Sequence, residues 1–548
     1  MCCKGVLAVL RCVNARASCV ARDVAGPSHA VKNSAATIAV HTSGLNITQP
    51  SNLAAGFPYA RTQELRRRVA EVAGMRLSIV ALTAVTLAAG CSGDRTTPAV
   101  SPAVTHAAPA LKATTPIKHI VIVVQENRSF DNLFATFPGA DGATSGWAAA
   151  VPTSDRSQCP IYQRESVPLA KKNLAVGDDF GHRYADFLID YDTGLMDGFD
   201  VDPIPANRTK IACLHPYQYT DPQQIVPYWQ IAQQYVLADR MYQTQASGSF
   251  TAHQDLIAGG TAISTSESII DDPTGFPWGC DAPLGTTTSL ITVNGQYEQN
   301  VGPFPCFNQY ATLRDSFDAV KLPWKYYTEP VTQKHGGDTA GIWNAFDAIQ
   351  GVRYGNEWGK RVTTSDLQIF KDIKAKRLPA ICWVTPDALN SDHPQELQGN
   401  KDVDYGPSWV ASIVNAVGES DYWKSSAVIV LWDDWGGFYD HESPAFFDDQ
   451  GGLGFRVPML VVSPYAREGT TSQHGYISHT QYETASIVRF VEQNWNLPSM
   501  QLPDERAASI SDVFDFGQTP RSFTPISASQ PLSFFLHQKP SDRPPDSE

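Results

Sequence analysis

The stretch Lys118–Val124 (KHIVIVV), followed directly by Gln125, Glu126 and Asn127, decides the fold of this chain. Its apolar residues are not interrupted by the polar alternation of a strand that has one face in water. A short continuous run of this kind, rich in β-branched residues, is typical of a strand covered on both faces. The polar residues begin where the run ends, so this strand is expected to deliver Glu126 and Asn127 to one edge of a sheet.

Three later runs have the same character, and polar residues follow each of them: Ala380–Val384 before Thr385, Ala427–Trp432 before Asp433 and Asp434, and Val457–Val462 before Ser463. Two segments between or after the runs indicate helices, Trp409–Val417 and Tyr482–Trp495. Together these patterns predict an α/β fold with a central, mostly parallel sheet flanked by helices on both faces. Ligands of such sheets bind beyond the carboxyl ends of the strands, which is where the acidic residues stand.

Composition and charge exclude one class of partner. The 548 residues are 42% hydrophobic and 18% charged, a composition able to bury a large core. With 42 basic against 56 acidic residues the formal net charge is -14. We expect no nucleic-acid partner, because no basic stripe is present to contact a phosphate backbone.

An apolar segment, Leu77–Ala89, follows Met75 and Arg76 and leads into Gly90 and Cys91. It is too short to span a bilayer core, which takes about 20 helical residues, but it fits the apolar region of a secretory signal. The Ala-Ala-Gly-Cys ending resembles a bacterial lipoprotein signal, although Leu is preferred where Ala88 stands. Residues 75–91 are therefore predicted to be a lipoprotein-type signal peptide with a lipid on Cys91. Plain secretion and a buried core helix are the alternatives.

The segments on either side of this signal define the expected domain organisation. Residues 1–74 show no convincing periodicity, so they are interpreted as a disordered leader or as the product of a start assigned upstream in error. Residues 92–116 are rich in Thr, Ala and Pro, which is typical of a flexible tether. Residues 117–548 are expected to form the main domain, with loop insertions. The protein is expected to be exported to a bacterial cell envelope, either lipid-anchored or secreted.

Five cysteines follow Cys91, and none is spaced as a zinc knuckle or a redox pair. Export to an oxidising compartment permits disulfides. The predicted pairs are Cys159–Cys213 and Cys280–Cys306, with Cys382 buried in a strand.

Two adjacent pairs of oxygen ligands, Glu126-Asn127 and Asp433-Asp434, stand at two strand ends. Carboxylates that are aimed into one place repel each other, so a chain that gathers them usually binds a cation there. Three carboxylates and an amide oxygen suit one divalent ion: Mg²⁺, Mn²⁺ or Ca²⁺, with Zn²⁺ possible. The alternative is that Asp433-Asp434 forms a turn and Glu126 pairs with a neighbouring Arg.

The residues after the second acidic pair add polar groups to this expectation. Gly436 and Gly437 let the backbone approach a bound group closely. His441 follows, and other histidines recur in polar, loop-like contexts: His182, His253, His393 and His479. Lone histidines are more often structural than catalytic, but a metal site that binds phosphate and protonates a leaving oxygen needs such groups.

The segment Ile117–Phe134 (IKHIVIVVQENRSFDNLF) resembles the opening motif of the bacterial phosphoesterase family that includes nonspecific phospholipases C and secreted acid phosphatases. Five further blocks resemble the family in order, over about residues 117–500: His182 through Met196–Phe199, Ser247–His253, Asp392–Pro394, Leu431–His441, and Val457–Arg467 with Ser478–Glu492.

The resemblance implies an alkaline-phosphatase-like α/β fold and a set of site residues. It assigns Glu126, Asn127, Asp433 and Asp434 as metal ligands and Ser249 as the nucleophile. It places His182, His393 and His479 in the phosphate pocket, and we add His441. The sequence departs from the family at Asp434, where Glu is frequent, and at Ala252, where Asn is common.

The function expected from this resemblance is metal-assisted hydrolysis of phosphoric esters through a phosphoserine intermediate, of the phospholipase C or acid phosphatase type. The partner is a phosphate ester, with phospholipid as one option, and the membrane is reached through Cys91. A sulfatase would need a Cys-x-Pro-x-Arg sequence, which does not occur. The remaining alternative is a non-catalytic, surface-binding lipoprotein.

Overall fold

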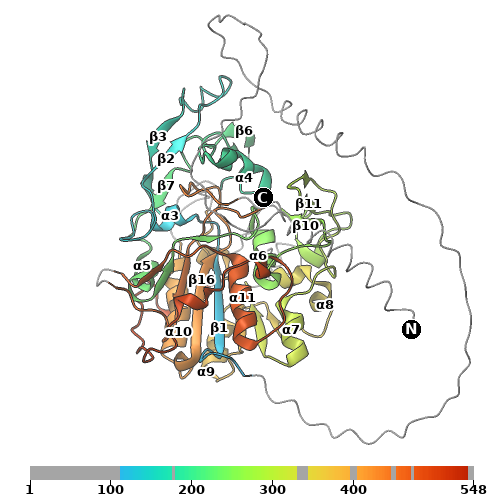
Figure 1. The fold of residues 1–548 in the computed structure, drawn as a ribbon, viewed down its shortest axis with the longest axis vertical. Helices are drawn as coiled ribbons and strands as arrows, with labels where there is room; N and C mark the ends of the chain where they lie inside the picture. Colours follow the sequence, from blue (N-terminus) through green and yellow to red (C-terminus); the bar gives the residue numbers. More distant parts are fainter. Residues whose placement is uncertain are drawn as a thin grey trace, which may run out of the picture. The chain divides into compact units, whose positions relative to one another are not determined.

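A computed structural model describes residues 112–175, 179–205, 207–329, 343–394, 404–445, 452–470 and 474–540 (Figure 1). All of these belong to one of two compact units, Thr105–Glu548. The predicted leader and signal peptide, with Cys91, lie outside the described residues. Thr114 and Thr115, expected to end the tether, already bond to the main domain: Thr114 N donates to Asn494 O at 2.7 Å.

An eight-stranded sheet has the order β14-β13-β15-β1-β16-β17-β8-β18. Its strands are β1 (His119–Gln125), β8 (Val236–Ala238), β13 (Trp324–Tyr327), β14 (Val362–Thr363), β15 (Ile381–Val384), β16 (Ser426–Trp432), β17 (Met459–Val462) and β18 (Tyr476–Ser478). The central strand β1 is parallel to both of its neighbours, and β17 alone runs against its neighbours. The predicted mostly parallel sheet is confirmed, and all four predicted strands lie in it.

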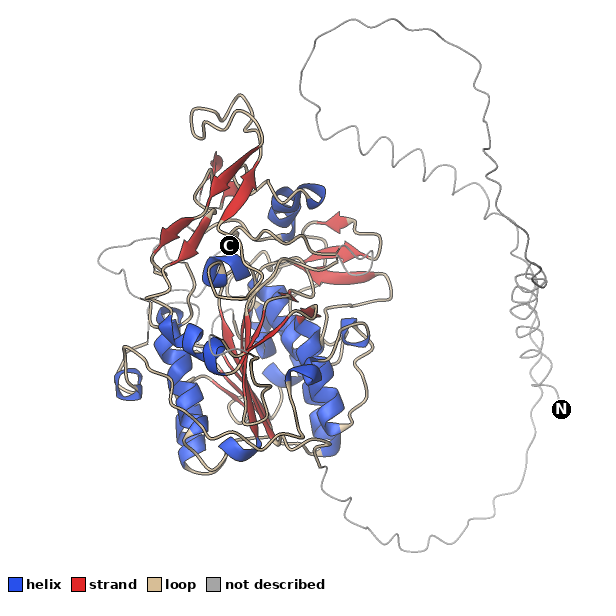
Figure 2. Ribbon diagram, turned by 60° about the vertical axis from the view of Figure 1, so that its left-hand side comes forward, coloured by secondary structure: helices blue, strands red, loops and turns tan. Residues whose placement is uncertain are grey.

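Helices cover both faces of this sheet (Figure 2). The helices α5 (Val226–Gln234) and α10 (Gly406–Gly418) pack against each other, as do α6 (Ser249–Ala258) and α11 (Thr484–Trp495). Ile120 to Val124 are fully buried between these layers. Burial of each such side chain stabilises the fold by about 1.5–3 kcal/mol, which explains why Ile120–Val124 contains no polar residue.

The remaining elements are shorter. The helices are α3 (Phe130–Phe134), α4 (Tyr184–Tyr191), α7 (Leu313–Val320), α8 (Gln350–Arg353), α9 (Gln368–Lys374) and α12 (Leu532–Phe535). Two strands, β9 (Met241–Tyr242) and β19 (Tyr482–Glu483), form a parallel pair. The 3-10 turns are η2 (Asp192–Gly194), η3 (Gly279–Asp281), η5 (Ala345–Ala348), η6 (Ala388–Asn390), η7 (Trp423–Ser425), η8 (Pro503–Glu505) and η9 (Ile510–Val513). No helix among the described residues is long and apolar enough to cross a bilayer.

A group of short strands and α4, here called the small lobe (described residues within 145–220), lies between β1 and β8 in the chain. Its strands are β2 (Ser145–Ala148), β3 (Glu165–Pro168), β4 (Ala170–Lys172), β5 (Pro203–Ile204), β6 (Asn207–Ile211) and β7 (Gln218–Thr220). Figure 1 shows these elements gathered beyond one end of the central sheet. That end is the carboxyl end of β1, because α3 follows β1 and packs against β7.

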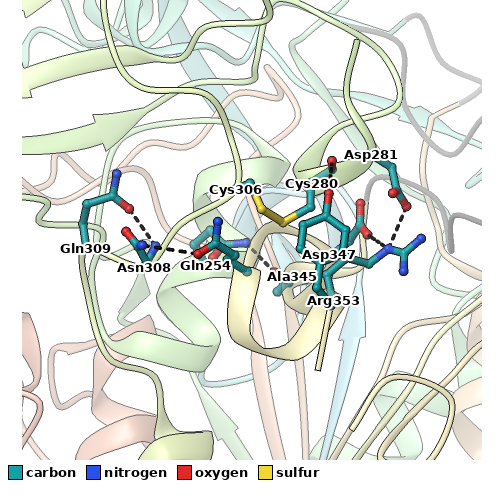
Figure 3. Close-up of a disulfide and its surroundings, with 11 residues drawn as sticks. Gln254, Cys280, Asp281, Cys306, Asn308, Gln309, Ala345, Asp347 and Arg353 are labelled. Carbon is teal, nitrogen blue, oxygen red and sulfur yellow. Dashed lines mark hydrogen bonds and ion pairs between the residues drawn. A yellow bond between two sulfur atoms is a disulfide. The ribbon is translucent and has the colours of Figure 1, made fainter. Parts of the chain in front are cut away.

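Both predicted disulfides are present, and Cys382 is free and buried in β15. Cys159–Cys213 lies in the small lobe. Cys280–Cys306 lies in the segment that contains the three-stranded sheet of β10 (Glu267–Ile270), β11 (Ser289–Thr292) and β12 (Tyr297–Glu298). Figure 3 shows this second disulfide beside Asp347 and Gln254, and Gln254 Nε2 on α6 donates to Ala345 O at 2.9 Å.

Candidate metal and nucleophile site

The two acidic pairs lie side by side because their strands are neighbours. Strands β1 and β16 are parallel and paired through their last residues, Gln125 opposite Trp432. The next residues, Glu126 and Asp433, therefore leave the sheet at the same edge. Asp433 N donates to Gln125 O at 3.0 Å, which continues the ladder by one bond.

One half of the site consists of Glu126, Asp433 and His253, all buried. His253 Nε2 lies 3.0 Å from Glu126 Oε1 and 3.7 Å from Asp433 Oδ2. One ligand atom from each of the three residues lies within 4.8 Å of the others, close enough to share one ion.

The chemistry of this donor set fits a divalent cation. Asp433 Oδ1 accepts a hydrogen bond from Asn127 N at 3.0 Å, but Oδ2 accepts none within the described ranges. A buried carboxylate oxygen without a donor is costly unless a cation compensates it. Two carboxylates with an imidazole nitrogen suit Zn²⁺ or Mn²⁺ as well as harder ions.

The other half of the site centres on Ser249, the first residue of α6. Its Oγ lies 3.1 Å from Asp434 Oδ2 and 3.3 Å from Asn127 Oδ1, and both atoms are hydrogen-bond acceptors for the single hydroxyl proton. Ser249 is fully buried. The N-terminus of a helix favours negative charge, so a phosphoryl group on this hydroxyl would be stabilised by α6.

His182 joins this second half from the small lobe. Its Nε2 lies 3.0 Å from Asn127 Nδ2 and 3.8 Å from Asp434 Oδ2. Its Nδ1 lies 2.8 Å from the carbonyl oxygen of Phe180, which only a protonated nitrogen satisfies. We therefore assign the proton to Nδ1, which makes Nε2 the acceptor of the hydrogen bond from Asn127 Nδ2.

The first glycine after Asp434, Gly436, allows another part of the backbone to approach closely. Gly436 has a φ of 60°, and a Cβ at this position would lie 2.4 Å from Asn127 O. Gly436 N also donates to Asp434 Oδ1 at 2.7 Å. The sequence led us to expect that Gly436 would approach a bound group, but the group that it approaches is the backbone of Asn127. Asn127 itself has a φ of 54°. This contact holds the two acidic pairs together.

The other predicted histidines lie in different surroundings. His393 is buried, its Nδ1 lies 2.7 Å from Pro394 O, and its ring is 5.9 Å from that of Trp343. It is close to β1 in the fold, since Glu126 N donates to Ser391 O at 2.7 Å.

His441 and His479 belong to a second carboxylate cluster. His441 Nδ1 lies 2.7 Å from Asp131 Oδ2, and His479 Nδ1 lies 2.8 Å from Asp239 Oδ2. Asp141 links them, because its N donates to Asp239 at 2.9 Å and its Oδ1 lies 3.5 Å from His441 Nε2. The structure therefore brings His182 to Asn127 and Asp434, the two residues that hydrogen-bond Ser249, and it places His441 and His479 in an ion-pair network.

This network makes stability depend on pH through His441. Burial lowers the pKa of His441, but the hydrogen bond to Asp131 and the charges of Asp131 and Asp440 outweigh burial and raise it to about 9. A histidine with a raised pKa stabilises the fold fully below its unfolded pKa of about 6.5, and this contribution is lost as the pH rises through about 9.

We expect His441→Gln to lower the free energy of unfolding by about 1–3 kcal/mol at about pH 6, with the difference shrinking above about pH 9. Urea denaturation at several pH values measures it. The exposed His537, replaced in the same way, is the control and should change little. A deficit that grows with pH would contradict the assignment.

His253 is the site residue that the sequence patterns did not select. In the sequence it is one of several histidines in polar contexts and the last residue of the Ser247–His253 block, and it stands four residues after Ser249 on α6. Residues four apart lie on the same face of a helix. A serine and a histidine with this spacing, at the start of one helix, were therefore the available signal.

Comparison with known proteins assigns the chain to a family. The Phosphoesterase family profile matches residues 117–498. The non-hemolytic phospholipase C of Pseudomonas aeruginosa is 23% identical over 478 residues, covering 78% of this chain and 62% of that protein. Phospholipase C B of Mycobacterium tuberculosis is 25% identical over 462 residues, covering 75% of this chain and 80% of that protein.

A solved structure, described as a protein in the alkaline phosphatase superfamily from Vibrio parahaemolyticus, is similar with a TM-score of 0.32 and 11% identity, covering 74% of this chain and 76% of that one. The family match extends over most of the main domain, from the start of β1 to the end of α11 and beyond. It includes both acidic pairs, Ser249 and His182. This chain belongs to the Phosphoesterase family.

Proposed function

We propose that the chain is a metal-dependent phosphoric-ester hydrolase with Ser249 as its nucleophile. The carrying observation is the Ser249 hydroxyl, which hydrogen-bonds Asp434 and Asn127 inside a buried carboxylate cluster. Glu126, Asn127, Asp433 and Asp434 are the proposed ligands of one divalent ion, and His253 joins them.

Bound there, the ion supplies positive charge that offsets the charge of the phosphoryl group and favours the ionised form of a neighbouring hydroxyl. Asp434 and Asn127 orient the Ser249 hydroxyl through their hydrogen bonds. As Oγ attacks phosphorus, its proton passes to Asp434 Oδ2, 3.1 Å away. The P–O bond of a phosphoserine forms, and the bond to the alcohol breaks. The N–H groups at the start of α6 face the phosphoryl oxygens. Water then cleaves the phosphoserine and restores the Ser249 hydroxyl.

His182 is the histidine that we assign to proton transfer. A protonated ring 3.8 Å from Asp434 Oδ2 would be stabilised by that carboxylate and could donate to the departing alcohol oxygen. The neutral ring would then accept a proton from the attacking water. His393, His441 and His479 keep their predicted places in the phosphate pocket as proposals, and the contacts of His441 and His479 favour a structural role for both.

We propose a phospholipid or a related phosphodiester as the substrate, since the relatives named above are phospholipases C. Hydrolysis of soluble phosphomonoesters, the acid phosphatase type, is the second candidate. A lipid on Cys91 would hold the enzyme at the membrane of the cell envelope, where such a substrate is found.

The test compares p-nitrophenyl phosphate with p-nitrophenyl phosphorylcholine, each with and without a chelator. We expect the phosphorylcholine ester to be turned over faster, and the chelator to stop both reactions. Faster turnover of the monoester would favour the acid phosphatase type. No turnover of either ester by metal-loaded protein would leave the non-catalytic, surface-binding alternative.

A further inference from the structure

The small lobe, which contributes His182 to the proposed active site, exposes large apolar side chains. Their exposed fractions are high for such residues: Trp147 45%, Tyr162 65%, Leu188 39%, Leu195 51% and Leu214 38%. Scattered surface leucines are ordinary, so their connections decide whether they form one surface.

Two arginines and a disulfide connect these side chains. Arg164 lies over the ring of Trp147, 4.3 Å from its centroid, and its Nη2 donates to Leu195 O at 3.2 Å. Arg156 lies 5.4 Å from the ring centroid of Tyr162. The Cys159–Cys213 disulfide ties the segment of Tyr162 to Leu214. Arg164 therefore holds Trp147 and Leu195 together, and the disulfide holds the segments of Tyr162 and Leu214 together.

The charges of the small lobe are separated by depth. Two acids of the lobe are exposed, Glu165 and Asp192. Five cationic residues are exposed: Arg164, Lys171, Lys172, Arg208 and Lys210. Five acids lie buried beneath: Asp186, Asp190, Asp197, Asp200 and Asp202. Burial also raises the pKa of Asp200 to about 7, which reduces the negative charge under the surface. In a chain of net charge -14, this lobe shows cations to solvent.

The lobe is also joined to the reacting groups. It contributes His182, and Asp190 on α4 accepts a hydrogen bond from Trp435 Nε1 at 3.1 Å, directly after Asp434 in the chain. The lobe that carries the exposed apolar side chains therefore also carries a residue of the proposed active site.

We propose that the small lobe is a lipid-docking surface, in which Trp147, Tyr162 and Leu195 enter the interfacial region of a bilayer. The cations that contact the lipid phosphates are Lys172 and Lys210, because Arg164, Lys171 and Arg208 are paired with Asp197, Asp221 and Asp186. Aromatic rings with a polar edge, flanked by Lys and Arg, suit this boundary. The proposal rests on the proposed function, because docking would present lipid esters to Ser249.

The test measures co-sedimentation of the full chain with vesicles of phosphatidylcholine and phosphatidylglycerol. Every sample carries Cys91→Ser, so that no lipid chain is attached. We expect the combined variant Trp147→Ser, Tyr162→Ser and Leu195→Ser to bind at least about tenfold more weakly, a loss of about 1.4 kcal/mol. The matched control is Tyr354→Ser, an aromatic residue outside the lobe that is 64% exposed with Arg353 5.8 Å from its ring. It should bind as the parent does.

A second variant tests the charges without removing apolar contacts. Lys172→Glu with Lys210→Glu should weaken binding and remove its dependence on phosphatidylglycerol. Turnover of the soluble p-nitrophenyl phosphorylcholine should be unchanged in both variants. The turnover assay therefore tests the active-site proposal, and the sedimentation assay tests the docking surface separately. The docking surface would be overturned if the parent protein did not bind the vesicles, or if the triple variant bound them as tightly as the parent. A loss of binding in Tyr354→Ser equal to that in the triple variant would also overturn it.

Discussion

Replacement of Ser249 by alanine should abolish ester hydrolysis while the protein stays folded and metal-loaded. The variant lacks the only atom proposed to attack phosphorus, and loss of a catalytic nucleophile typically lowers kcat by about four to six orders of magnitude. The fold should tolerate the change because alanine is the best helix former and Ser249 is the first residue of α6. Steady-state hydrolysis of p-nitrophenyl phosphorylcholine, with a thermal melt and elemental analysis, measures all three properties.

The neighbouring Ser247 provides the matched control. Its Oγ donates to Asp271 Oδ1 at 3.0 Å and lies 3.2 Å from Thr251 Oγ1, away from the carboxylates around Ser249. Ser247→Ala should therefore lower stability and keep most of the turnover per folded molecule. Turnover within tenfold of the parent in Ser249→Ala would falsify the nucleophile assignment.

Glu126→Gln and Asp433→Asn should each lower the bound metal well below that of the parent protein. Both replacements keep the size of the side chain and remove the charge that offsets the ion. Changes in residues that merely orient metal ligands cost about 10–100-fold in affinity or activity, so loss of a ligand should cost at least as much. Elemental analysis after dialysis, followed by activity assays with added metal, measures the effect.

The thermal stability of the metal-free protein adds a second readout. Chelation should lower the Tm of the parent, because an ion that binds only the folded state stabilises it. Metal-free Asp433→Asn should be at least as stable as the metal-free parent, since one of the crowded buried charges is gone.

Asp131 is the control carboxylate for the metal assignment. It belongs to the cluster of His441 and Arg456, so Asp131→Asn should destabilise the protein and leave its metal content unchanged. An unchanged metal content in Glu126→Gln, or a loss in Asp131→Asn, would move the ligand set to the second cluster.

The sequence by itself determined four of the eight strands of the central sheet, the helices α10 and α11, and the acidic strand ends. Burial on both faces leaves a continuous apolar run, such as Ile120–Val124, that is visible without any neighbour. The point where the run stops then marks the sheet edge, which places Glu126 and Asp433. Ser249 was assigned through a resemblance of contiguous blocks, and its contact with Asp434 agrees with that assignment.

Only the tertiary structure decided which histidines meet these residues. Asn127 and Asp433 bond although 306 positions separate them, because β1 and β16 are adjacent in the sheet. No local pattern encodes strand order, so the sequence did not show that His253 reaches Glu126, or that His441 pairs with Asp131. The small lobe shows the same limit: five aspartates, Asp186 to Asp202, stand between two groups of exposed cations in the sequence, and only the fold shows that these acids are buried.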